Sequence, residues 1–309
     1  MSTATTTPAA NTPAAKPAAA KLPGLSFGGE LRSEWIKLRT LRSTLWCYVI
    51  IVILTIGLGL LIASALPAPA VGAAAATHDV QQSTWVTVST LGISFAQLVS
   101  AVLGALVITG EYGTGMIRST FAAVPKRLPA IVAKALVFGA TTFIVALVGL
   151  VAAALLTAPL LPGKDITPDF GDGNVWLALV GGAGYVALIG LLAFGIGLII
   201  RSSAAGIAAA LGLVLVVPTI LQVLSTVTRA DWPANIAAFL PNSAGGKLYA
   251  YPGAAAESIT PARPGAAASA AASAANTITL DSWQGLLVLL GWVVVAVVVG
   301  AILVKRRDA

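Results

Sequence analysis

The stretch Leu45-Trp-Cys-Tyr-Val-Ile-Ile-Val-Ile-Leu-Thr-Ile-Gly-Leu-Gly-Leu-Leu-Ile-Ala-Ser-Ala65 contains no charged residue. As a helix it is long enough to cross the hydrocarbon core of a bilayer, which takes about 20 residues. Further apolar runs of similar or greater length follow along the chain: Val88–Ile108, Ala130–Leu156, Val175–Ile200, Ala204–Val227 and Gly285–Val304. We therefore predict an all-α integral membrane protein with six transmembrane helices.

The composition supports a bilayer rather than water as the main solvent. Of the 309 residues, 58% are hydrophobic and 9% are charged, whereas soluble domains carry about 25% charged residues. The net charge of +7 comes without a nucleic-acid motif or an aromatic-laced basic patch, so we expect no nucleic-acid partner. The single cysteine, Cys47, and the single histidine, His78, exclude a disulfide within the chain and a Cys/His metal cluster.

The distribution of basic residues predicts the orientation. An even number of spans places both termini on one side of the membrane. Of the 18 Lys and Arg residues, four fall in the connections on the opposite side: Lys164, Arg229, Lys247 and Arg263. The positive-inside rule therefore predicts that both termini are cytoplasmic.

The N-terminal region divides into two parts. Residues 1–24 are rich in Ala, Thr and Pro and predict a disordered tail ahead of the six-helix domain at 25–309. Within 27–44, Leu31, Trp35 and Leu38 recur at helical spacing, with Lys37 and Arg39 on the flanks and the far side. This pattern favours an amphipathic helix in the headgroup layer over a solvated start to the first span.

Polar residues are rare within the apolar runs. Lys134 lies about one turn into the third run, where its ammonium group can snorkel to the interface. Gln97 and Gln222 either form hydrogen bonds between helices or line a translocation path. Because no Asp, Glu or His lies inside the six runs, we expect no proton-coupled transport.

Small and helix-breaking residues predict details of the helix packing. The glycines of 181–184 and 190–197 predict close helix contacts, and Pro218 predicts a kink in the fifth span. The fourth and fifth runs are separated by 201–203 alone, which requires a tight helical hairpin. In the outer connection 228–284, Trp232–Tyr251 predicts a short element at the membrane surface and Ala254–Ala275 a loose tether.

The chain lacks the motifs of nucleotide binding and catalysis. The pairs Gly163-Lys164 and Gly246-Lys247 are followed by Asp and Leu, not by the Ser or Thr of a P-loop. His78 beside Asp79 is expected to be a solvated pair in an outer loop. We therefore expect no catalytic residue, no cofactor and no metal site, so the chain is not predicted to be an enzyme.

The polar stretch Gly110-Glu-Tyr-Gly-Thr-Gly-Met-Ile-Arg-Ser-Thr120, followed by Pro125-Lys-Arg-Leu-Pro129, separates the second and third spans. It combines an acid, an aromatic ring, glycines and an arginine, and Thr114–Ala123 could form a short helix. A few basic residues would suffice for a topology signal, so this composition predicts a further role on the cytoplasmic side.

Together with Leu31-Arg-Ser-Glu-Trp-Ile-Lys-Leu-Arg-Thr-Leu-Arg-Ser43 and Leu240-Pro-Asn-Ser-Ala-Gly245, this stretch resembles the permease subunits of type 2 ATP-binding-cassette (ABC) exporters, especially short actinobacterial ones. The resemblance covers about residues 27–307. It implies the type 2 exporter transmembrane fold in a bacterial plasma membrane. The Ala-rich segment 254–275 is longer than that family requires.

The resemblance also implies roles for individual residues. Residues 27–43 correspond to the connecting helix, with Glu34, Trp35, Lys37 and Arg39. Residues 111–123 correspond to the coupling helix that docks on the ATPase. Its contact residues are Glu111, Tyr112, Gly113, Thr114, Gly115 and Arg118. Residues 235–251 correspond to a re-entrant segment, and the working unit contains two permease and two ATPase chains.

These observations lead to a first hypothesis and two rivals. The first is a permease subunit that exports a substrate with energy from a separate cytoplasmic ATPase. The alternative is a non-transporting membrane subunit that regulates or anchors an ATPase complex in envelope function or resistance. An intramembrane enzyme would have to use His78 and Asp79.

The predicted orientation can be tested by cysteine labelling in a variant that lacks Cys47. A cysteine at Ala268 should react with a membrane-impermeant thiol reagent from outside the cell, and a cysteine at Ser119 should not. The opposite labelling pattern would overturn the orientation.

Overall fold

The computed structural model describes residues 26–67, 76–113, 115, 127–252 and 278–306. Within these ranges the chain is helical and contains no strand. Six of the described helices are long and apolar enough to cross a membrane: Arg42–Ala65, His78–Gly113, Leu128–Leu160, Gly173–Ile200, Ser203–Thr228 and Ser282–Arg306. The predicted all-α, six-span membrane protein is confirmed.

The described elements follow one another in this order: α1 (Phe27–Thr40), α2 (Arg42–Ala65), α3 (His78–Thr90), α4 (Ile93–Gly113), α6 (Arg127–Thr157), the short 3₁₀ turns η1 (Ala158–Leu160) and η2 (Pro162–Lys164), α7 (Gly173–Ile200), α8 (Ser203–Leu211), the π-helical segment η3 (Gly212–Val216), α9 (Val217–Thr228), α10 (Asp231–Ala238), α11 (Pro241–Gly246) and α13 (Ser282–Arg306). The predicted tail at 1–24, the predicted helix at 114–123 and the predicted tether at 254–275 lie outside the described residues, apart from Gly115.

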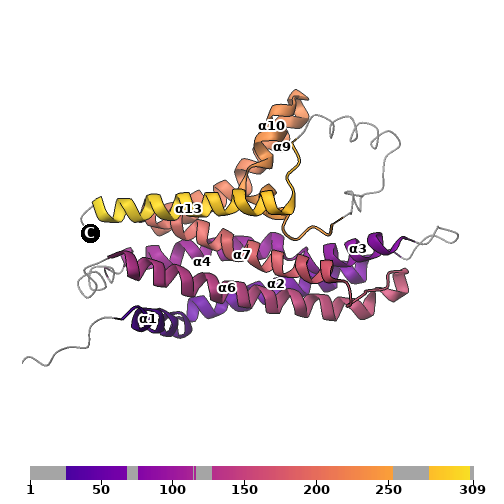
Figure 1. Ribbon diagram of the computed structural model, residues 1–309, viewed down its shortest axis with the longest axis horizontal. Helices are drawn as coiled ribbons and strands as arrows, with labels where there is room; N and C mark the ends of the chain where they lie inside the picture. Colours follow the sequence, from indigo (N-terminus) through magenta and orange to yellow (C-terminus); the bar gives the residue numbers. More distant parts are fainter. Residues whose placement is uncertain (1–25, 68–75, 114, 116–126, 253–277, 307–309) are drawn as a thin grey trace, which may run out of the picture.

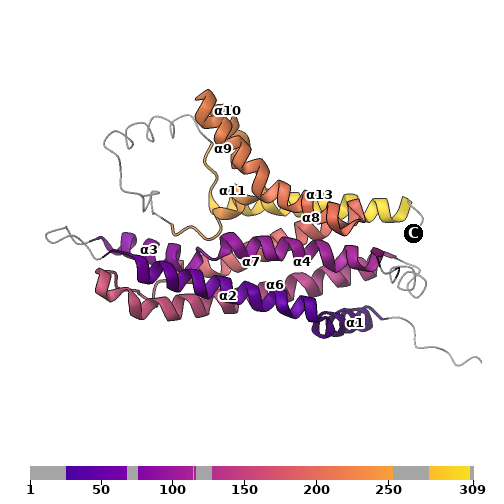
Figure 2. The ribbon, with the colours of Figure 1, turned by 180° about the vertical axis from the view of Figure 1, so that it is seen from behind.

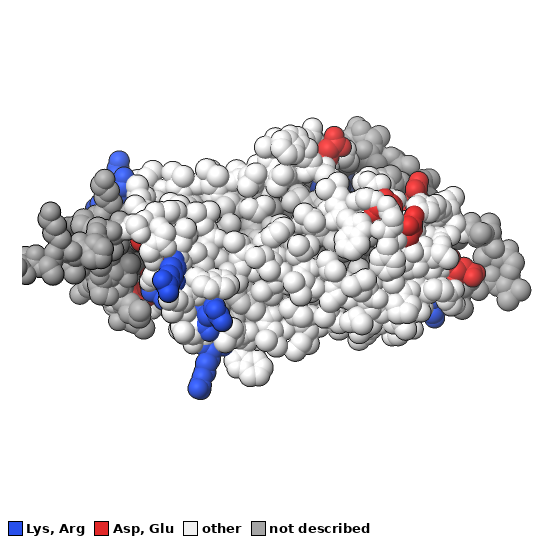
Figure 3. All heavy atoms as spheres, turned by 60° about the horizontal axis from the view of Figure 1, so that its bottom comes forward, with Lys and Arg blue, Asp and Glu red and all other residues white. Residues whose placement is uncertain are grey.

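The long helices α2, α4, α6, α7 and α13 run along a common axis, with α1 beside the start of α2 (Figures 1 and 2). The start of α1 and the end of α13 lie at the same end of this bundle (Figure 1). On the face seen in Figure 3, Lys and Arg gather mostly toward this end and Asp and Glu mostly toward the other. We call the end with α1 the basic end and the other the outer end.

Close packing in the core depends on glycine. The hydrogen of Gly104 in α4 faces the backbone of Gly190 in α7, and a Cβ atom at position 104 would lie 2.0 Å from the Gly190 carbonyl oxygen. Ser100 of α4 donates a hydrogen bond of 2.8 Å to the carbonyl oxygen of Val186 beside this contact. The predicted close approach of helices at the glycines of 190–197 is confirmed.

The segment 27–44 forms a helix of its own. The Ser26 side chain caps α1 by accepting a hydrogen bond of 3.2 Å from the Gly29 amide. The helix ends at Thr40 because Leu41 is extended (φ −76°, ψ 110°), and α2 begins at the next residue. The structure thus separates α1 from the first span, as the interfacial interpretation requires.

The second span is longer than the predicted Val88–Ile108. It consists of α3 and α4, which meet at a break at Leu91 and Gly92. Gly92 lies against α2, where a Cβ atom would come within 2.4 Å of Thr55 Cα. Sequence reasoning missed α3 because its first turns are polar. Gln82, for example, donates to the Thr167 carbonyl oxygen at 2.9 Å and accepts from the Asp169 amide at 3.0 Å.

The hairpin between α7 and α8 and the bend in the fifth span were both predicted. Arg201 turns the chain in the left-handed conformation (φ 60°), and α8 begins two residues later. Pro218 is the second residue of α9, one turn or less after the π-helical segment η3, and it lacks the amide hydrogen that a regular helix would use. Beyond this segment α9 leans away from the bundle (Figures 1 and 2).

The Gly104 contact generates a first structural prediction. Gly104→Val should lower the thermal unfolding midpoint in detergent, because overpacking costs about 1–3 kcal/mol when neighbours can shift and the neighbour here is backbone. Gly291→Val in α13 is the matched control, since nothing lies within 4 Å of a Cβ atom at position 291. Equal midpoints for the two variants would contradict the proposed α4–α7 contact.

Candidate functional site

An ion cluster at the basic end joins three helices. It consists of Glu34 and Lys37 from α1, Glu111 from the last turn of α4 and Lys134 from α6. The Lys134 ammonium group pairs with Glu34 Oε2 and lies 2.7 Å from Glu111 Oε1. Lys37 Nζ lies 2.8 Å from Glu34 Oε1 and 3.1 Å from Glu111 Oε1. Each ammonium group therefore contacts both carboxylates.

The cluster is largely shielded from solvent. The exposed fractions of the side chains are 8% for Lys134, 7% for Glu34 and 11% for Glu111, against 28% for Lys37. Burial by itself lowers the pKa of Lys37, but the hydrogen bond to Glu34 and the charges of Glu111 and Glu34 outweigh it and raise this pKa above its ordinary value. The two positive and two negative charges balance, as a buried ionic group requires.

These positions correct the expectation for Lys134. Lys134 does not snorkel to the interface but points into the protein, because both carboxylates lie within its reach. Lys37 is partly exposed at a flank of α1, and its ammonium group closes the cluster. Glu34 and Leu38 form the buried face of α1.

The polar stretch after the second span begins at this cluster. Tyr112, the next residue after Glu111, lies beneath Arg201, whose guanidinium carbon is 5.2 Å from the ring centroid. Arg201 also donates a hydrogen bond of 3.2 Å to the carbonyl oxygen of Leu303 in α13. Gly113 and Gly115 are exposed, and Gly115 adopts a positive φ of 71°. Thr114 and Arg118 lie outside the described residues.

The remaining predicted residues of α1 face outward. Trp35 is 43% exposed, and the Arg39 guanidinium carbon lies 5.8 Å from the centroid of its ring. α1 therefore places Glu34 and Lys37 in the ion cluster and presents Trp35 and Arg39 to the surroundings.

A buried polar chain links α4 to the outer end. The Tyr185 hydroxyl of α7 donates a hydrogen bond to Gln97 Oε1 of α4 and lies 2.9 Å from Asn242 Oδ1 of α11. Gln97 is 7% exposed, and its amide nitrogen donates to the Ser94 carbonyl oxygen at 3.2 Å. Gln97 thus accepts one hydrogen bond between helices, from Tyr185, which is one of the two roles predicted for it.

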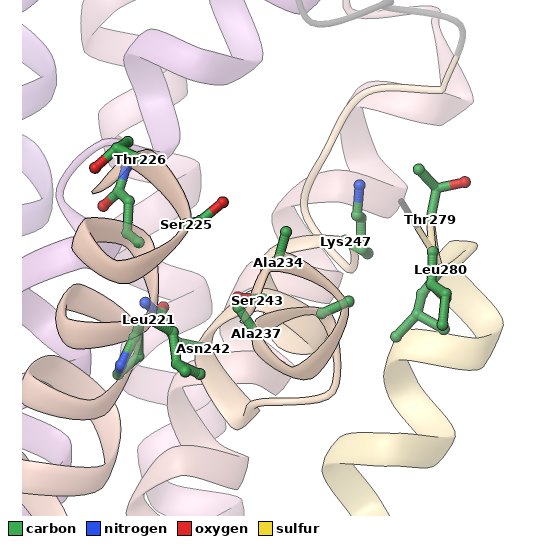
Figure 4. Close-up of a pocket in the computed structure, with 14 residues that line it drawn as sticks. Leu221, Ser225, Thr226, Ala234, Ala237, Asn242, Ser243, Lys247, Thr279 and Leu280 are labelled. Atoms are coloured by element: carbon green, nitrogen blue, oxygen red, sulfur yellow. The ribbon is translucent and has the colours of Figure 1, made fainter. Parts of the chain in front are cut away.

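Gln222 occupies a different environment. It lines a cavity of about 520 Å³ at the outer end, between α9, α10, α11 and residues 278–280. Figure 4 shows Ser225 and Thr226 of α9 on one side of this cavity and Lys247 and Thr279 on the other. The structure does not bring Gln97 and Gln222 into contact, but Asn242 both lines the cavity and contacts Tyr185.

The stretch Leu240–Gly245 contains most of α11, which forms part of the wall of this cavity. A Cβ atom at Gly245 would lie 2.2 Å from the Tyr185 ring, and one at Gly285 of α13 would lie 2.3 Å from the Ala244 carbonyl oxygen. Such short distances allow no side chain between α11 and its neighbours. The predicted short element in Trp232–Tyr251 therefore corresponds to α10 and α11.

His78 lies in a solvated acidic setting at the outer end. It is 57% exposed, with Nδ1 3.7 Å from Asp79 Oδ1 and Nε2 3.5 Å from Asp169 Oδ2. The expected solvated pair is thus present, with Asp169 as an additional neighbour.

No protein-family model matches this sequence, and no curated protein matches it either. The site must therefore be interpreted from its own geometry. Sequence reasoning selected Glu34, Lys37, Glu111 and Gln97 but missed Lys134, Tyr185 and Asn242. The one available signal for Lys134 was a charged residue inside an apolar run, which commonly has a partner.

The ion cluster predicts that the stability of the folded protein depends strongly on Lys134. Lys134→Met should reduce the free energy of unfolding by about 3–5 kcal/mol, because it leaves buried carboxylates uncompensated. Adding Glu34→Gln restores charge balance and should recover part of the loss. Thermal unfolding in detergent measures both effects.

Lys305→Met, at an exposed position of the same end, is the control for this series. A Lys134→Met variant as stable as this control, or a double variant no more stable than Lys134→Met alone, would contradict the role assigned to the cluster.

Proposed function

We propose that this chain is the membrane-spanning permease subunit of an ATP-driven exporter, powered by a separate cytoplasmic ATPase. The observation that carries the proposal is the position of α4 between two polar sites. At the basic end its Glu111 belongs to the ion cluster, and deeper in the membrane its Gln97 contacts Tyr185 and, through it, Asn242 of α11. These two α4 residues are about 21 Å apart along the helix.

This arrangement supports an external source of energy. The apolar runs contain no Asp, Glu or His that could relay protons. ATP binding by a partner could drive transport if the partner contacts one conformation of the permease better than another. The polar stretch that begins after Glu111, of which Gly113 and Gly115 are exposed, is the natural contact. Glu111 is tied to α1 and α6, so a displacement there would move all three helix ends together.

The cavity at the outer end is consistent with binding of a transported small molecule. The cavity there combines the amide of Gln222 and the hydroxyls of Ser225 and Thr226 with apolar side chains. Its size falls within the range of small-molecule sites, about 300–1,000 Å³. None of the residues of α9 is buried, so a second permease copy against this helix would complete the cavity wall.

The proposal is tested by isolating the chain with its partners. Affinity purification in mild detergent should recover a P-loop ATPase in stoichiometric amount, identified by mass. A photoreactive residue at Thr114 should crosslink to that ATPase, whereas one at Gly163, at the outer end, should not. Recovery without any ATPase, together with no crosslink at position 114, would refute the proposed function.

A substitution refines the test. Arg118→Glu should lower ATPase recovery by about tenfold or more, because a charge-assisted contact contributes about 1.5–3 kcal/mol. Arg306→Glu reverses a charge at the same end outside the proposed contact and should leave recovery unchanged. Equal losses in both variants would mean that general charge, not a docking contact, holds the partner.

A further inference from the structure

A groove lies beside α1 at the basic end. It has a volume of about 420 Å³ and runs between α1, α2 and α6. Trp35 and Arg39 line it on α1, Val49 and Ile53 on α2, and Val145 on α6. The lining residues on α2 extend from Leu45 to Ile53, about 12 Å along the helix. The groove therefore leads from the level of α1 toward the hydrocarbon core.

The hydroxyl groups along this groove have partners within the protein. The Tyr48 hydroxyl lies 3.1 Å from Thr142 Oγ1, and the Thr141 hydroxyl donates to the Val137 carbonyl oxygen at 2.7 Å. The nearby carboxylates Glu34 and Glu111 are taken by Lys37 and Lys134. Among the described residues, no ion pair involves Arg39. The groove thus combines apolar walls with a guanidinium group available at its mouth.

The depth of the groove matches the polar–apolar boundary of a bilayer. α2 is 24 residues long, about 36 Å, and exceeds the hydrocarbon core of about 30 Å. Its first residues therefore lie at headgroup level, where Trp35 and Arg39 of the adjoining α1 are also suited to reside. Figure 2 shows α1 directly beside the start of α2.

We propose that this groove binds an anionic phospholipid of the leaflet at the basic end, with one acyl chain between α1, α2 and α6 and the phosphate on Arg39. The arginine donors match phosphate oxygens in a bidentate geometry. An anionic lipid is preferred because its phosphate, unlike that of phosphatidylcholine, is not accompanied by a positive headgroup charge that would repel the guanidinium group. The acyl chain buries the apolar walls, and the headgroup supplies the negative charge that Arg39 lacks. The bound lipid contacts α1 at Trp35, Leu38 and Arg39, next to the ion-cluster residues Glu34 and Lys37. This inference does not depend on the proposed function.

Photolabelling tests the site directly. The purified chain is placed in phosphatidylcholine vesicles that contain a small fraction of either phosphatidylglycerol or phosphatidylcholine with a photoreactive group on one acyl chain. The phosphatidylglycerol probe should label α2 between Leu45 and Ile53 several-fold more than the phosphatidylcholine probe. Equal labelling by the two probes would overturn the proposal, because the groove would then not select an anionic headgroup.

Three variants separate the site from general surface charge. Arg39→Gln should reduce labelling by the anionic probe about tenfold, as expected for the loss of a charge-assisted contact. Arg32→Gln removes the same charge from an exposed position of α1 outside the groove and should have little effect. Val49→Trp fills the groove and should remove the excess labelling of α2 by the phosphatidylglycerol probe over the phosphatidylcholine probe. An equal loss with Arg32→Gln, or an unchanged excess with Val49→Trp, would refute the site.

Discussion

The architecture depends on how the charge of Lys134 is compensated inside the membrane domain. An isolated ammonium group in such surroundings is costly, and it becomes tolerable through contact with both Glu34 and Glu111. Compensation comes from two other helices, so it also dictates where those helices can lie. α1, which is outside the apolar spans, is attached to the bundle at Glu34 and Leu38 for this reason. The end of α4 is held at Glu111 in the same way.

From Glu111, α4 extends through the bundle and makes two further contacts with α7. Its middle part packs on α7 through backbone contact at Gly104, and Gln97 connects it to Tyr185. Tyr185 in turn contacts Asn242, which lines the outer cavity. One helix thus combines an ionic contact, a backbone contact and a polar side-chain contact, each with a different part of the bundle. Its position is therefore determined at several depths of the membrane.

The sequence was most informative where composition alone decides the structure. Long apolar runs predicted the six spans. Pro218 predicted the irregular fifth span, and the short 201–203 connection predicted the hairpin between the fourth and fifth spans. Prediction was weaker where a polar residue has a partner far along the chain. Lys134 and Glu34 are 100 residues apart, and no local periodicity links them. α3 was missed for the same reason, because Gln82 is satisfied by backbone groups near Thr167. The ATPase-coupling roles of Thr114 and Arg118, which lie outside the described residues, remain predictions.

The chain order of the ion cluster has a consequence for biogenesis. Glu34 and Glu111 are synthesised before Lys134, which arrives with the third span. A lysine without a partner costs about 2.5–3.5 kcal/mol at the centre of a span and less near its end. Here the two carboxylates that pair with Lys134 already belong to the nascent protein. When the third span enters the membrane, the Glu34 and Glu111 carboxylates are therefore already available to pair with Lys134. Membrane insertion and tertiary assembly become one event at this point of the chain.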